Sequence, residues 1–98
     1  MTIKQQKENK KLIVSINGRI DTNTAPEFMD YLKGAMVDIE ELVIDLKEVD
    51  YISSAGLRVL LFAQKTMNAL GSMSVTNVNE DIMETFELTG FTDILTIA

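Results

Sequence analysis

The sequence contains no cysteine, no histidine and no tryptophan among its 98 residues. Without cysteine there can be no disulfide, no thiolate metal ligand and no redox thiol. Without histidine the chain lacks the commonest general base and neutral metal ligand, and it cannot form a Ser-His-Asp triad. No P-loop and no G-x-G-x-x-G pattern is present. We therefore do not expect an enzyme, and we expect no catalytic residue, no metal and no cofactor.

Positive charge and long apolar runs are also scarce. Nine Lys and Arg against fifteen Asp and Glu give a formal net charge of −6. This charge disfavours phosphate backbones and anionic membrane surfaces, so we expect neither nucleic acid nor membrane as a partner. No apolar stretch reaches the roughly 18–20 residues that span a bilayer. The first residues also lack the apolar core of a secretory signal, and we expect a cytoplasmic protein.

The length of 98 residues predicts one domain over residues 1–98, and a hydrophobic share of 46% suits a compact fold. Its first part predicts a β-hairpin. Residues 3–8 and 11–18 have the composition of strands, and Asn9 and Lys10 suit a tight turn between them. The first strand is polar, which is typical of the edge of a sheet.

A helix is predicted to begin at Thr24. This residue suits an N-cap, Glu27 would complete a capping box, and Pro26 suits the first turn. Gly34 weakens the last turn. Apolar residues at helical spacing predict one buried stripe: Phe28, Leu32, Ala35, Met36 and Ile39.

The second half predicts a strand, a helix and a second strand. The run 41–46 is rich in β-branched residues, and a strongly apolar helix follows from about Ser54 to Leu70, with Gly71 as its stop. Residues 72–78 alternate between polar and apolar, as in a half-buried strand.

The last predicted helix covers residues 80–89. Asn79 suits its N-cap, Gly90 its end, and Phe91 the apolar contact that often follows such an end. Residues 94–97 are too short for an assignment.

The order β-β-α-β-α-β-α predicts an α/β fold with a mixed sheet of four to five strands and helices packed against it. Right-handed crossovers make successive strands parallel, so the loops after strands 11–18, 41–46 and 72–78 should meet at one edge, where open α/β sheets bind ligands. The polar residues expected at this edge are Asp21, Thr22, Asn23, Ser53, Ser54, Asn77 and Asn79.

Ser53 and Ser54 fall where a strand ends and a helix begins. A serine there can be a plain N-cap, worth about 1 kcal/mol. It can also accept a phosphate, because a helix N-terminus tolerates the added charge of about −1.5 to −2. Ile52 stands where a nucleophile elbow needs glycine, so we interpret Ser54 as a candidate phosphorylation switch rather than a nucleophile. Gly56 either permits close approach of a neighbouring segment or leaves room for a kinase.

Asp45, Glu48 and Asp50 are close together in the sequence, near the end of a predicted strand. Such a group is most often solvated, and we do not expect it to bind a metal.

Two motifs resemble one protein family. Residues 51–60, YISSAGLRVL, are similar to the signature of STAS domains, specifically the stand-alone bacterial anti-sigma factor antagonists. Residues 18–25, GRIDTNTA, resemble the motif that follows the second strand in that family. Length and element order agree along the whole chain.

The resemblance implies a partner-switching regulator. The unphosphorylated antagonist binds an anti-sigma factor that is also a serine kinase, phosphorylation of one serine breaks the complex, and a serine phosphatase reverses it. Ser54 matches the phosphoacceptor and Asp21 the acidic position. Ser53 stands where many relatives have Asp, so it is the alternative acceptor.

The expected partner-binding residues are Asp21, Thr22, Asn23, Ser53, Ser54, Gly56, Leu57 and Arg58. We expect a monomer. The alternative function is a non-switching STAS subunit, acting as a static interaction module of a transporter or another complex.

Overall fold

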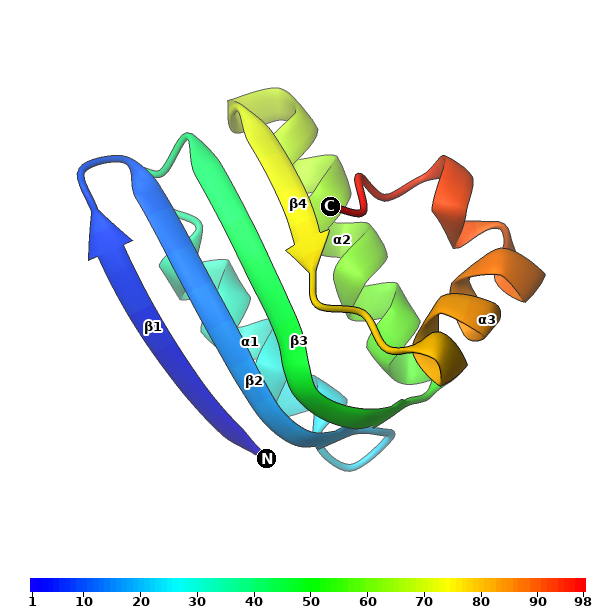
Figure 1. Cartoon of the computed structure of the whole chain (residues 1–98). Coiled ribbons are helices and arrows are strands. Elements are labelled where there is room, and N and C mark those ends of the chain that lie inside the picture. Colours follow the sequence, from blue (N-terminus) through cyan, green and yellow to red (C-terminus); the bar gives the residue numbers. More distant parts are fainter.

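Four strands form one mixed sheet in the computed structural model, which describes residues 1–98. β1 (Thr2–Glu8) pairs antiparallel with β2 (Lys11–Ile20), and β3 (Glu41–Ile52) and β4 (Ser72–Thr76) continue the sheet as parallel strands. The strands follow in chain order, β1-β2-β3-β4 (Figure 1). The predicted α/β class and element order are confirmed.

Three helices accompany the sheet. α1 (Ala25–Ala35) and α2 (Ser54–Leu70) pack on one face, whereas α3 (Glu80–Thr89) lies beyond β4 and is followed by a short 3₁₀ helix, Phe91–Asp93 (Figure 1). The opposite face of the sheet carries no helix. None of the helices combines the length and apolar character needed to cross a membrane.

The core lies between the sheet and the pair α1 and α2. Every second residue of the central strands points into it, as the two-residue period of a strand requires. The inward residues include Leu12, Val14, Ile16, Leu42, Ile44 and Leu46. Of the predicted α1 stripe, Phe28, Leu32, Met36 and Ile39 are buried, whereas Ala35 is only half-buried.

The central strands are longer than predicted. β3 continues past residue 46 to Ile52, because Val49 and Ile52 return to the core after the polar pair Lys47 and Glu48. β2 likewise reaches Ile20, with register shifts in its second half. β4, by contrast, stops at Thr76 rather than 78, since Asn77 adopts a left-handed backbone with φ 57°.

Several predicted turns and helix ends are confirmed. Asn9 adopts the positive φ of a tight hairpin turn. Asn79 caps α3 by accepting the Ile82 N–H at 2.8 Å, and Gly90 ends α3 in the left-handed conformation, with φ 79°. Phe91 then stacks on Phe86, with ring centroids 6.4 Å apart.

Gly71 ends α2 as predicted, but for a different reason. Its φ of 169° is extended backbone that any residue adopts, so no left-handed turn requires glycine here. A Cβ at this position would lie 1.9 Å from the carbonyl oxygen of Glu40. Glycine is therefore needed because the loop before β3 passes directly against the end of α2.

Candidate functional site

The end of β2 and the start of α2 meet through a backbone hydrogen bond. The N–H of Ser53 donates to the carbonyl oxygen of Ile20 at 2.8 Å. Asp21 follows Ile20 and Ser54 follows Ser53, so the two loops come together as predicted. We call the surface formed by Asp21, Thr22, Asn23, Ser53 and Ser54 the rim.

The loop after β4 does not reach the rim, so the prediction that all three loops meet at one edge is wrong. The Asn77 side chain donates to Asp45 Oδ1 at 2.9 Å, well before β3 ends at Ile52. Asn79 donates to the carbonyl oxygen of Val49 at 3.1 Å. Because β3 extends beyond β4, these two asparagines lie beside the middle and second half of β3 and are not part of the rim.

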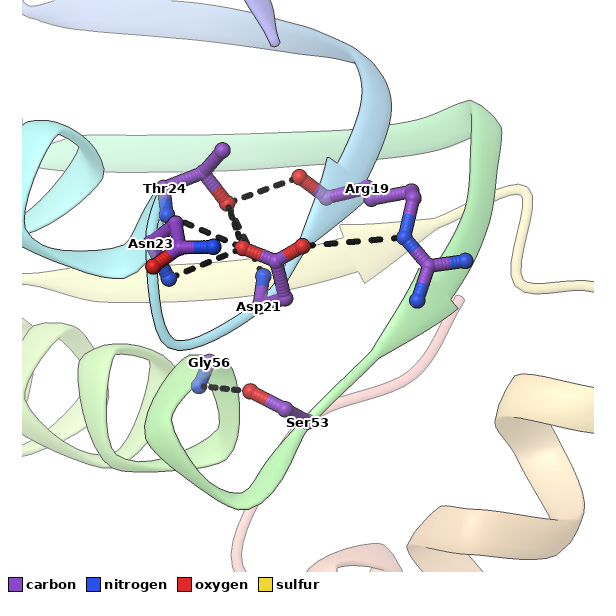
Figure 2. Close-up of polar contacts among 6 residues, drawn as sticks. All are labelled: Arg19, Asp21, Asn23, Thr24, Ser53 and Gly56. Atoms are coloured by element: carbon purple, nitrogen blue, oxygen red, sulfur yellow. Dashed lines mark hydrogen bonds and ion pairs between the residues drawn. The ribbon is translucent and has the colours of Figure 1, made fainter.

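Asp21 organises the loop after β2 (Figure 2). Its Oδ1 accepts the backbone N–H of Asn23 at 2.9 Å and that of Thr24 at 3.0 Å. An aspartate that binds the backbone two and three residues ahead stabilises a turn. The carboxylate is therefore held in place immediately before α1.

Thr24 does not cap α1 with its side chain, so the predicted capping box with Glu27 is wrong. Its hydroxyl instead accepts the N–H of Asp21 at 2.8 Å and donates to the carbonyl oxygen of Arg19 at 2.8 Å. This crosslink closes the loop between β2 and α1. Pro26 does occupy the first turn, as predicted.

Asp21 is held in its charged form. The N–H of Thr24 is the main cause that lowers the pKa of its carboxyl, with further contributions from Asn23 and from the Arg19 guanidinium. Arg19 Nε lies 3.6 Å from Asp21 Oδ2, and the guanidinium lies 4.2 Å from the centroid of the Tyr51 ring. The rim thus carries one fixed negative charge, paired with an arginine that is itself stacked on an aromatic ring.

The two serines have different positions. Ser53 is the N-cap of α2, with its Oγ accepting the Gly56 N–H at 3.3 Å, and it is half-buried (Figure 2). Ser54 is the first residue of α2, is exposed, and its side chain makes no hydrogen bond. Ser53 is therefore the helix cap, and of the two serines only Ser54 has a free hydroxyl that a phosphate could modify without loss of the cap.

Gly56 allows α2 to approach the sheet. A Cβ at this position would lie 2.7 Å from Ile20 Cγ2 and 2.7 Å from Ile52 Cγ1. The close-approach interpretation of this glycine is confirmed. Gly56 is buried, and Leu57 is only 6% exposed. Both therefore pack beneath the surface of the rim, and neither is accessible to a partner.

A shallow groove of about 260 Å³ adjoins the rim between the first turns of α1 and α2. It is mostly apolar and is lined by Thr22, Ala25, Pro26, Met29, Ala55, Arg58 and Val59. Arg58 is exposed and makes no hydrogen bond or ion pair. The exposed residues Thr22, Asn23, Ser54 and Arg58 therefore lie around one accessible surface.

The acidic residues near the strand ends do not gather. The structure contains no group of three or more His, Cys, Asp or Glu side chains placed to hold a metal. Asp45 instead accepts the N–H of Lys47 at 2.9 Å and the amide of Asn77. The rim therefore offers a docking surface, and the hydroxyls of Thr22 and Ser54 on it make no hydrogen bond within the chain.

Sequence reasoning missed Arg19 and Tyr51. They become cross-strand neighbours only because β2 and β3 both extend beyond their predicted ends. Asp21 could have indicated the role of Arg19. A carboxylate at the rim is often paired with a nearby cation, and the chain has only two arginines, Arg19 and Arg58.

Comparison with known proteins gives a consistent result. The family model described as STAS domain matches residues 1–98. The chain is 34% identical over 95 residues to the anti-sigma-B factor antagonist of Bacillus subtilis, covering 96% of this chain and 86% of that protein. It is 31% identical over 97 residues to the anti-sigma-B factor antagonist of Listeria monocytogenes, covering 95% and 83%. The crystal structure of an anti-sigma factor antagonist from Mycobacterium paratuberculosis superposes with a TM-score of 0.89 at 25% identity, covering 98% and 83%.

Proposed function

Because this chain belongs to the STAS domain family, we propose that it is an anti-sigma factor antagonist that works by partner switching. In the unphosphorylated state the rim binds an anti-sigma factor that is also a serine kinase. Phosphorylation of Ser54 releases that partner, and a serine phosphatase restores binding. The chain itself performs no catalytic step.

The observation that carries this proposal is the exposed Ser54 hydroxyl, which makes no hydrogen bond and lies in a loop that is hydrogen-bonded to the end of β2, one residue before Asp21. The hydrogen bond between the Ser53 N–H and the Ile20 carbonyl oxygen joins the two loops. A phosphate on Ser54 would add a charge of about −1.5 to −2 next to Asp21. A partner that covers both groups would have to desolvate two like charges at once.

The energies required are modest. A standard interface buries about 800 Å² on each partner, whereas this chain exposes 5530 Å² in all. Loss of about 2.7 kcal/mol of binding free energy weakens an interface a hundredfold. We retain the monomer as the expected state.

Ser54 is favoured over Ser53 as the acceptor by their surroundings. The Ser53 hydroxyl accepts a hydrogen bond from the Gly56 N–H and is half-buried, so a kinase would have to displace a helix cap to reach it. Ser54 can be approached without disturbing α2. Asp21, Thr22, Asn23 and Arg58 complete the proposed contact surface.

The decisive experiment begins with co-purification from the native cell. A kinase and a phosphatase among the bound proteins support the switch, and transporter subunits support the static alternative. The chain is then incubated with that kinase and ATP. Mass spectrometry should show one phosphate on Ser54, unchanged in Ser53→Ala and absent in Ser54→Ala. Phosphate found only at another residue, or at none, would remove the proposed role of Ser54.

A further inference from the structure

Arg58 lies one helical turn after Ser54. Residues four apart on a helix share a face, with their Cβ atoms about 5–6 Å apart. Both residues belong to the continuous helix α2 and both are exposed. A long arginine side chain at this spacing can bring its guanidinium to any group attached to the Ser54 oxygen.

The two arginines of the chain differ in their partners. Arg19 is engaged by Asp21 on one side and by the ring of Tyr51 on the other. Arg58 makes no ion pair and no hydrogen bond, and its side chain lines the groove beside Thr22 and Pro26. A free guanidinium is therefore available next to Ser54, while the other one is already occupied.

We propose that Arg58 is the internal counter-ion of a phosphate on Ser54. The inference rests on the proposed function, because it concerns the phosphorylated form of that same site. The planar guanidinium suits bidentate hydrogen bonding to two phosphate oxygens, a geometry that a lysine ammonium cannot match. On phosphorylation the Arg58 side chain leaves the groove and turns toward residue 54.

This pairing gives the modification a second effect on the surface. Before phosphorylation the groove beside α1 has a free cation at its border. After phosphorylation that cation is occupied by the phosphate, so a partner loses a positive contact and also meets a new negative charge next to Asp21. Arg58 thus acts in the switch as a positioning residue.

The test uses the full chain with phosphoserine installed at position 54 by genetic code expansion, so no kinase is needed. Titration followed by phosphorus NMR measures the second pKa of the phosphate, which is ordinarily about 6. Arg58→Gln should raise this pKa by about 0.15–0.4 relative to the unsubstituted chain, as expected for loss of a surface ion pair at this spacing. Arg58→Lys should restore part of the shift.

Lys65→Gln is the matched control. Lys65 is an exposed cation on the same helix, eleven residues after Ser54, so its removal changes the net charge equally at a distance of about 16 Å along the axis. Asp21 and Arg19 are present and unchanged in every variant, so their effects on the phosphate pKa cancel. If Arg58→Gln moves the pKa no more than Lys65→Gln does, the proposal is overturned.

The outcome is distinguishable from failure of the proposed function. The phosphate pKa could be equal in Arg58→Gln and Lys65→Gln while a co-purified kinase phosphorylates Ser54 efficiently. That result would remove the role of Arg58 alone. A clear shift in the chain with installed phosphoserine, together with no kinase that modifies Ser54, would remove the switch and leave the ion pair.

Discussion

The backbone N–H of Ser53 donates a hydrogen bond to the carbonyl oxygen of Ile20 over 2.8 Å. This bond joins the end of β2 to the start of α2, one residue before both Asp21 and Ser54. A charge acquired by Ser54 would therefore enter a loop that this bond joins to the loop of Asp21.

The two serines should differ in their contribution to stability. Ser53→Ala removes the Oγ that accepts the Gly56 N–H, and it should lower the free energy of unfolding by about 0.5–1 kcal/mol. Ser54→Ala removes no hydrogen bond and should change it by less than about 0.5 kcal/mol. Urea denaturation measures both. A larger loss for Ser54→Ala than for Ser53→Ala would contradict the assignment of the cap.

Gly56 should not tolerate even one methyl group. In Gly56→Ala the Cβ would press against buried atoms of Ile20 and Ile52, a cost that exceeds the gain in helix propensity. We expect a net loss of about 1–2 kcal/mol in the free energy of unfolding.

Gly34→Ala is the matched control for that substitution. No atom lies within 4 Å of a Cβ placed at this helical glycine, so alanine should stabilise the chain by about 0.5–1 kcal/mol. Opposite signs for the two variants in thermal denaturation are the expected result. Stabilisation by both would show that α2 does not press on the sheet.

Asp21 should make stability depend on acid pH. Its pKa is lowered in the folded state, so its charged form stabilises the fold above the unfolded-state pKa of about 3.9. That contribution disappears as the pH falls through the lower folded-state pKa. Asp21→Asn keeps the acceptor oxygen but not the charge, so it should be less stable than the unsubstituted chain at pH 7 and approach it in strong acid. Denaturation midpoints across this range, with no convergence at low pH, would refute the role of the charge.

Ser54→Asp should separate folding from docking. An acidic residue in the first turn is favoured by the partial positive charge of a helix N-terminus, so the free energy of unfolding should stay the same or rise by a few tenths of a kcal/mol. Affinity for the anti-sigma factor should fall by about tenfold or more, because the carboxylate lies next to Asp21. Isothermal titration calorimetry checks the affinity, with Ser54→Ala as the uncharged control. Equal affinity for both variants would speak against charge repulsion as the release mechanism.

Local signals predicted most of the elements. The hairpin turn at Asn9, the cap at Asn79 and the end of α3 at Gly90 depend on the conformational preferences of single residues, and the structure has all three. The Ser53–Ser54 junction was located correctly for the same reason. What local chemistry could not decide was which serine is the cap.

The errors arose where distant segments decide the structure. Thr24 is a good cap residue in isolation, but its hydroxyl instead binds the Arg19 carbonyl oxygen, across the loop. Gly71 looked like an ordinary helix stop, yet the carbonyl oxygen of Glu40 is what excludes a side chain there. The polar pair Lys47 and Glu48 interrupts the apolar pattern, so the sequence did not predict the second half of β3. The end of β3 at Ile52 is defined by the pairing of this strand with β2.

The unequal lengths of β3 and β4 have a consequence for how any protein can approach. The rim follows the ends of β2 and β3, past the point where β4 stops, and leads directly into α1 and α2 (Figure 1). A protein that docks on Ser54 would therefore contact the end of the domain where β2 and β3 lead into α1 and α2. The helix-free face of the sheet is not part of the rim, so a protein that contacts only the rim would leave that face accessible to a second one.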